Sequence, residues 1–257
     1  MVKQNFKRTF ALLFTILILS SVILPVSAYG TDIQVPGNPW NHTMLYAEDE
    51  PINPNLIIIY LAGNGASGQK IEDLDVFAEM EHPVKYHREG LLELPDDAVF
   101  ICPQEYMDGE FYFYNDIFEE MIHAIASSAP DARIILAGHA EGADTVYAIA
   151  SRGNEYIDGY VFLSTSDFDK DDLPNMKNVF IAYGKDKSEN YRSIFRKLFK
   201  TNILRWKYAR ESTITEEKTN NAYIVGDWTA ESTPLVLTED FFWEWVFNII
   251  PTTVETK

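Results

Sequence analysis

The stretch LAGHAEGAD, residues 136–144, decides the fold of this chain. It follows the apolar run ARIIL at residues 132–136 and leads into a segment whose apolar residues recur at helical spacing. Gly138 and Gly142 flank the central alanine, and glycine allows the close backbone approach that a sharp reversal from strand to helix requires. The stretch therefore predicts a buried strand, a tight turn centred on Ala140 and a helix.

Apolar runs and amphipathic segments alternate along the rest of the chain. The run at residues 56–61 is continuous and β-branched, which is typical of a strand buried on both faces of a parallel sheet. Further strands are predicted at 44–47, 98–104, 132–138, 157–166, 178–186 and 203–209, and helices at 115–125, 140–153, 188–200 and 239–250, the last capped by Thr238. Residues 82–87 are expected in an irregular loop. The alternation predicts an α/β fold, a three-layer α/β/α sandwich with a mostly parallel sheet. The connection at residues 164–175 is too short for a cap domain.

The first 28 residues predict a signal peptide. Three cations precede a long apolar run, and VSA at residues 26–28 provides the small residues of a cleavage site. The alternative is an uncleaved membrane anchor, because the run is just long enough to span a bilayer. We therefore expect a secreted or cell-envelope protein, with residues 29–54 as an irregular lead-in, 55–251 as the folded domain and 252–257 as a tail.

Composition and charge argue against some classes of binding partner. The chain has 257 residues, of which 46% are hydrophobic, enough for one well-filled core. Its formal net charge is −18, and cleavage would remove three cations and no anions, which takes the charge to −21. Such acidity argues against nucleic acid and anionic membrane surfaces as partners. Membrane association is expected only if the N-terminal segment stays uncleaved.

The turns beyond the carboxyl ends of parallel strands are where ligands bind in such sheets. Asn64 and Gly65 follow the first central strand, and Glu141 opens the helix after Ala140. Backbone N–H groups at these positions are candidates for binding a ligand oxygen. Cys102 is the only cysteine, which excludes an internal disulfide, and its place in a strand predicts a buried, inert thiol.

Motifs for cofactors and metals do not appear in the sequence. There is no phosphate-binding glycine loop and no pair of histidines at metal-binding spacing. The acidic stretch at residues 166–172 lacks the central glycine and the closing glutamate of a calcium loop. We therefore expect no cofactor and no metal ion.

Three stretches carry a resemblance to a known family. They are IIIYLAGNGASG at residues 57–68, HPVKYHREG at 82–90 with DDAVFICPQ at 96–104, and ILAGHAEGADTVYAIA at 135–150. These stretches resemble α/β-hydrolases of the secreted carboxylesterase and dienelactone-hydrolase-like group. The resemblance implies the α/β-hydrolase fold, a serine–histidine–acid triad, an oxyanion hole and ester substrates. Within this pattern, the turn centred on residue 140 is the nucleophile elbow.

The implied triad is incomplete when it is transferred position by position. Ala140 stands where the serine belongs, and Asp186 fits the place of the triad acid. Asp227, beside Trp228, stands where the histidine is expected, and no histidine follows His139 in the chain. In the family pattern, His139 precedes the nucleophile and points away from the triad. His139 and Trp228 remain candidates for ligand binding.

Three hypotheses on function follow from these residues. Without nucleophile or base, acyl transfer loses a factor on the order of 10⁴–10⁶. The first hypothesis is an exported, inactive hydrolase-fold protein that binds a small acyl or glycan ligand, or an extracellular or envelope protein. The second is an active, carboxylesterase-like serine hydrolase in which Ala140 has replaced the nucleophile. The third is an interaction module of the cell envelope that keeps its N-terminal segment.

Overall fold

The computed structural model describes residues 41–47, 54–63, 81–104, 115–165, 176, 178–184, 213–216 and 219–249. Within these segments, the strands are β1 (Asn41–Leu45), β2 (Leu56–Leu61), β3 (Ala98–Gln104), β4 (Arg133–His139), β5 (Gly159–Leu163), β6 (Val179–Gly184), β7 (Thr213–Glu216) and β8 (Thr219–Gly226). The helices are α3 (Pro83–Arg88), α4 (Asn115–Ser128), α5 (Glu141–Arg152), the 3₁₀ helix η6 (Thr233–Thr238) and α7 (Asp240–Phe247).

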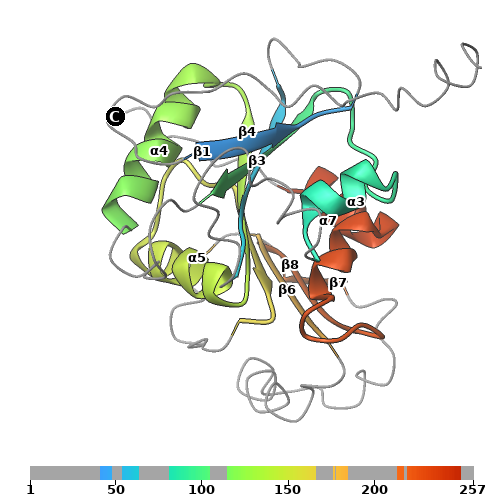
Figure 1. Ribbon diagram of the computed structural model, residues 1–257. Coiled ribbons are helices and arrows are strands. Elements are labelled where there is room, and N and C mark those ends of the chain that lie inside the picture. The colour runs from blue at the N-terminus through green and yellow to red at the C-terminus, as the bar shows by residue number, and fades with distance from the viewer. Residues whose placement is uncertain are drawn as a thin grey trace, which may run out of the picture.

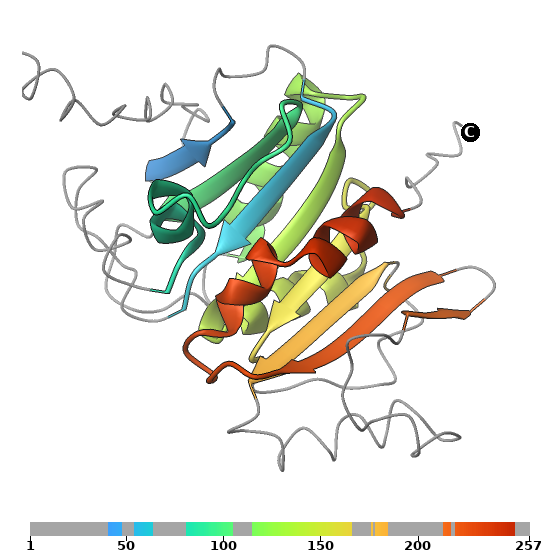
Figure 2. The ribbon, with the colours of Figure 1, turned by 90° about the vertical axis from the view of Figure 1, so that its right-hand side faces the viewer.

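The eight strands form one sheet in the order β1-β3-β2-β4-β5-β6-β8-β7 (Figure 2). The six central strands are parallel, and β1 and β7 pair antiparallel at the two edges. At the end of β2, Leu61 lies opposite Gly138 of β4, and Leu163 of β5 lies opposite His139. The turns that follow these strands therefore meet at one edge of the sheet, which confirms the predicted, mostly parallel architecture.

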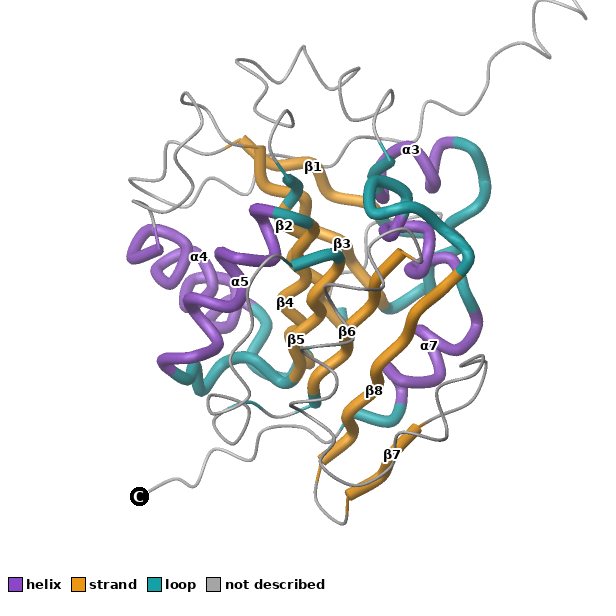
Figure 3. Tube along the Cα trace, turned by 90° about the horizontal axis from the view of Figure 1, so that it is seen from below, coloured by secondary structure: helices purple, strands orange, loops and turns teal. Residues whose placement is uncertain are grey.

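Helices cover both faces of the sheet, with α4 and α5 on one side and α3, η6 and α7 on the other (Figure 1, Figure 3). Successive residues of a strand point to opposite faces, so β2 contributes to both layers. Ile57 and Ile59 belong to the core under α4 and α5, whereas Ile58 and Tyr60 belong to the core under α3 and α7. Burial on both faces explains why the strand is apolar throughout.

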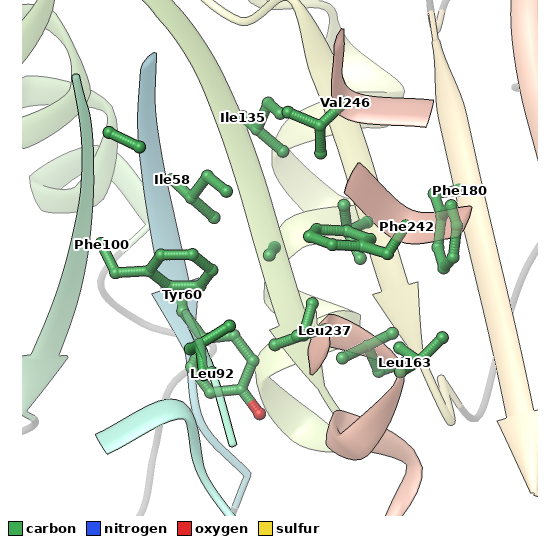
Figure 4. Packing of buried hydrophobic residues seen from close by; sticks show 14 of the residues in the cluster. Ile58, Tyr60, Leu92, Phe100, Ile135, Leu163, Phe180, Leu237, Phe242 and Val246 are labelled. Atoms are coloured by element: carbon green, nitrogen blue, oxygen red, sulfur yellow. The ribbon is translucent and has the colours of Figure 1, made fainter. Parts of the chain in front are cut away.

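The aromatic C-terminal helix packs into the second of these cores. The ring of Phe180 on β6 meets the ring of Phe242 edge to face, with centroids 5.3 Å apart, and lies 5.1 Å from the ring of Trp245. Figure 4 shows Phe242 between Phe180 and Leu237. Edge-to-face contacts of this kind add about 0.5–1.5 kcal/mol to the burial of each ring pair. Helix α7 is therefore part of the core, as its spacing predicts.

Helix α3 replaces the irregular loop that the sequence predicts at residues 82–87, so that prediction was wrong. His82 is the N-cap, and its Nδ1 accepts the backbone N–H of Val84 at 3.1 Å. Pro83 occupies the first helical position, where its fixed φ suits a helix and its missing N–H costs nothing. Histidine is not among the usual capping residues, so the start of this helix has no clear signal in the sequence.

Other boundaries also differ from the predicted ones. The N-cap of α7 is Glu239, whereas Thr238 ends η6 and its hydroxyl donates to the Leu235 carbonyl. Strand β8 was not predicted, since Asn220 and Asn221 disfavour a strand. Edge strand β1 begins three residues earlier than expected and lies inside the predicted lead-in. The helix predicted at 188–200 and the strand predicted at 203–209 lie outside the described residues.

No helix in the segments that the structure describes has the length and apolarity to span a bilayer. The predicted signal peptide, residues 1–28, lies outside these segments, as does the acidic stretch at residues 166–172.

Candidate functional site

Ala140 occupies the turn between β4 and α5 in a strained backbone conformation, with φ 50° and ψ −120°. Positive φ in a residue other than glycine costs about 1–3 kcal/mol and persists only where the surroundings impose it. The Ala140 N–H donates to the Leu163 carbonyl at 2.9 Å, and the Ala140 carbonyl accepts the Asp144 N–H at 3.1 Å. The fold thus holds Ala140, whose side chain is only a methyl group, in a backbone conformation that is typical of functional turns.

Two glycines let this turn form. A Cβ on Gly138 would overlap the Gly142 carbonyl, and a Cβ on Gly142 would overlap the Leu61 carbonyl and lie 2.5 Å from the Ala62 carbonyl oxygen. The first turn of α5 therefore lies directly against the end of β2. The N-terminal N–H groups of α5 point toward the same sheet edge, where they favour a ligand oxygen or an anion.

The end of β2 faces the elbow from the other side. A Cβ built on Gly63 would lie 3.1 Å from the Ala140 Cβ and 3.1 Å from Oε2 of Glu141. The structure therefore brings Glu141 beside Ala140, with its carboxylate turned toward Gly63. Asn64 and Gly65, the other predicted oxygen-binding positions, lie outside the described residues, and so does Asp186.

His139 reaches the loop that follows β8. Its Nε2 lies 2.8 Å from the Ala230 carbonyl oxygen, and because a carbonyl only accepts, Nε2 carries the proton and donates. Burial lowers the pKa of His139, while the bond to Ala230 and the charges of Glu141 and Glu231 act in the opposite direction. The family pattern implied that His139 points away from the triad, but its imidazole contacts the loop in which the triad histidine is expected.

Hydroxyl groups also hold the loop after β8 in place by hydrogen bonds. The Ser164 hydroxyl, at the end of β5, lies 3.1 Å from the Ala230 carbonyl oxygen and 2.7 Å from the Thr233 hydroxyl. The Thr233 hydroxyl in turn donates to the Thr229 carbonyl at 2.9 Å. Residues 229–233 are therefore fastened to the ends of β4 and β5 by side chains from both strands, so the elbow and this loop form one unit.

Replacement of Thr233 by valine should weaken this attachment. Thr233→Val keeps the buried shape but removes both hydroxyl contacts, so we expect a loss of about 1–2 kcal/mol in the free energy of unfolding. Urea unfolding measures the difference. Thr238→Val, which removes a hydroxyl bond inside η6, is the control and should cost about 0.5 kcal/mol. Equal costs in the two variants would contradict the role assigned to Thr233.

Asp227 and Trp228 follow β8 directly, at the sheet edge that also carries Ala140. Asp227 is exposed, and Trp228 is partly buried with its ring folded back over Gly226. A histidine at position 227 would stand in the loop that His139 and Ser164 hold. Asp227 therefore directly follows β8, and the resemblance implies that the triad histidine lies in the loop after this strand.

The other histidines lie elsewhere in the fold. His42 is in β1, His87 lies 3.1 Å from the Leu92 carbonyl through Nδ1, and His123 packs against the ring of Tyr156. Burial, and then the charge of His139, lowers the pKa of His82 to about 3. The Nδ1 lone pair of His82 already accepts the N–H of Val84, so this ring is committed to capping α3.

Cys102 is fully buried as a free thiol, and burial raises its pKa well above the usual range. It is therefore inert, as its position in a strand predicts. Within the described part of the chain, no group of three or more His, Cys, Asp or Glu side chains could hold a metal ion.

Several solved structures similar to this chain are hydrolases. A thermostable esterase matches with a TM-score of 0.54 at 11% identity, over 82% of this chain and 59% of the esterase. A dienelactone hydrolase from Anabaena variabilis matches with a TM-score of 0.53 at 11% identity, over 86% of this chain and 97% of that protein. A serine hydrolase without a lid, from Xanthomonas campestris, matches with a TM-score of 0.52 at 10% identity, over 82% of this chain and 90% of its own.

No protein-family model and no curated protein sequence matches the chain. At such low sequence identity, the similar structures show the fold and do not show the activity. The mostly parallel sheet with helices on both faces is consistent with the fold of these neighbours. The chain has the α/β-hydrolase fold.

Proposed function

We propose that the chain is an exported protein, related to serine esterases, that binds a ligand or partner at the elbow without hydrolysing it. The observation that carries the proposal is Ala140 at the strained turn between β4 and α5, with φ 50°. The backbone geometry that presents a nucleophile is kept, but a methyl group has no lone pair with which to attack an acyl carbon.

The general base is the second missing group. Acyl transfer by a serine needs a base within hydrogen-bond reach to accept the hydroxyl proton. Asp227 stands after β8, and an aspartate carboxylate is ordinarily about 2.6 pKa units less basic than an imidazole. His139 precedes the elbow and donates its Nε2 proton to the Ala230 carbonyl. A single serine restored at position 140 would therefore lack a base suited to activate it.

Binding is the function that these changes leave intact. The N-terminal N–H groups of α5 still point at the sheet edge, and the loop of Trp228 is fastened beside them. We infer that the edge binds a small acyl or glycan ligand, or an extracellular or envelope protein. Export rests on the charged and apolar pattern of residues 1–28, and retention of that segment would anchor the protein at the membrane.

Labelling by a fluorophosphonate probe tests the proposal. We expect neither the natural chain nor Ala140→Ser to be labelled or to hydrolyse short acyl esters above a heat-denatured control. Ala140→Ser with Asp227→His restores both groups, and we expect its labelling rate to exceed that of the single variant by tenfold or more, since positioned base catalysis contributes about 10²–10⁴.

Two results would overturn the proposal. Ester turnover by the natural chain would show that the site is catalytic despite its alanine. Labelling of Ala140→Ser alone at the rate of ordinary esterases would show that a base other than residue 227 serves the elbow, and that the chain is a serine hydrolase with a substituted nucleophile. Circular dichroism of each variant confirms that the fold is kept.

A further inference from the structure

The hydroxyl group of Tyr60 is buried and makes no hydrogen bond to any residue that the structure describes. Tyr60 is the last but one residue of β2, and it is 1% exposed. Figure 4 shows its ring beside Phe100 and Leu92, with the hydroxyl oxygen pointing away from Phe100. A buried hydroxyl without a partner is destabilising, so proteins rarely keep one unless water or a ligand completes its hydrogen bonds.

This hydroxyl stays protonated and can donate. Burial, and to a lesser extent the nearby Cys102, raises the pKa of Tyr60 well above its usual range. The neutral phenol has one O–H group to donate and lone pairs with which to accept. A phenylalanine would fill the same apolar core without a polar atom, as Phe100 does on the neighbouring strand β3. The hydroxyl therefore needs a partner that the described side chains around it do not supply.

A second polar ring lies against Tyr60. The imidazole of His82 meets the Tyr60 ring edge to face, with centroids 5.1 Å apart. Burial, and then the charge of His139, lowers the pKa of His82 to about 3, so the imidazole is neutral. Its Nδ1 accepts the backbone N–H of Val84, and the proton is therefore on Nε2. Two neutral polar rings thus lie together between β2 and α3.

The surroundings of Tyr60 favour an uncharged partner. At the start of α3, the carboxylate of Glu81 is 2.7 Å from the Lys85 ammonium and accepts the Tyr86 hydroxyl at 2.6 Å, so its charge is compensated there. Among the described residues, only Cys102 acts electrostatically on the Tyr60 hydroxyl, and burial keeps that thiol neutral. An ionised ligand would lose its hydration without meeting an opposite charge, which costs far more than the burial of a neutral oxygen.

We propose that the Tyr60 hydroxyl binds the neutral oxygen, a carbonyl or a hydroxyl, of a small uncharged ligand between β2 and α3. The site is separate from the elbow, since Tyr60 lies opposite Ala137 on β4, ahead of the turn at Ala140. The inference goes beyond the proposed function and does not depend on it. Because Tyr60 is buried, entry requires local opening of α3, a helix of six residues.

Two probes of the same size test this site. 2-Butanone carries a neutral carbonyl that cannot be hydrolysed, and propanoate replaces it by a carboxylate. NMR titration measures binding through the ring signals of His82, and nuclear Overhauser effects from the ligand methyl protons identify contact with the ring of Tyr60. Tyr60→Phe removes only the hydroxyl. Tyr183→Phe, the same change on the opposite face of the sheet, is the matched control.

We expect 2-butanone to bind the natural chain and to contact the ring of Tyr60. Tyr60→Phe should weaken this binding about tenfold, because the ligand oxygen then loses its donor. Tyr183→Phe should change the affinity less than about twofold, since it leaves that donor in place. Propanoate should bind at least about tenfold more weakly than 2-butanone, because its charge must be desolvated.

The proposal is wrong if 2-butanone contacts neither ring, or if it binds Tyr60→Phe as tightly as the natural chain. Equal affinity for propanoate would show that the site does not select a neutral oxygen. The Overhauser measurement uses the natural chain alone, so it decides the question even if a variant fails to fold. Ester turnover by the natural chain would overturn the proposed function and leave ketone binding standing, so the two failures are distinguishable.

Discussion

Gly142→Ala is expected to destabilise the protein by at least about 3 kcal/mol, the largest effect of any single methyl group at this site. The added Cβ would overlap the Leu61 carbonyl and lie 2.5 Å from the Ala62 carbonyl oxygen. The obstacles are backbone atoms of Leu61, the last residue of β2, and of Ala62, which follows it, so neither can turn aside as a side chain would. Relief requires α5 to move away from the sheet. Urea unfolding, followed by far-UV circular dichroism, measures the loss.

Gly153→Ala is the matched control for this prediction. Gly153 follows α5 with φ 76°, and a Cβ there would meet nothing within 4 Å. Its substitution therefore meets no steric obstacle and costs only the strain of a positive φ, about 1–2 kcal/mol. Equal losses for the two variants would show that contact between α5 and β2 is not the constraint on position 142.

The short sequence around Ala140 was sufficient to predict the turn, because its requirements are local. Two glycines, a preceding buried strand and a following amphipathic helix all lie within about twenty residues of each other. The strand at 56–61 was equally clear, since burial on both faces demands an unbroken apolar run. Helix α3 and strand β8 were missed because a histidine cap and paired asparagines run against local preference.

The surroundings of the elbow could not be predicted in the same way. The side chain of Glu141 meets Gly63, and the imidazole of His139 meets Ala230, across separations of 78 and 91 residues. The first contact depends on the pairing of β2 with β4, and the second on the position of β8 beyond β6. Sequence spacing therefore predicted that the backbone N–H of Glu141 binds a ligand oxygen, but it could not predict where the carboxylate of Glu141 lies.

Acid should destabilise the protein through His82. Burial lowers the pKa of His82 to about 3 in the folded chain, against about 6.5 for an unfolded chain, so below pH 6.5 the unfolded state binds the extra proton. The free energy of unfolding should then be constant above pH 6.5 and fall by about 1.4 kcal/mol per pH unit below it, to a total near 5 kcal/mol at pH 3. Burial also lowers the pKa of His139, which adds to the loss in the same direction.

His82→Asn separates this titration from the other acid-sensitive groups. An asparagine amide oxygen can accept the Val84 N–H and cap α3, but it does not titrate. Carboxylates scarcely protonate between pH 6.5 and 5.5, so in this window the variant should lose about 1 kcal/mol less than the natural chain. Urea unfolding at intervals of half a pH unit measures both slopes. Parallel curves would show that His82 is not protonated during acid unfolding, and that another group carries the loss.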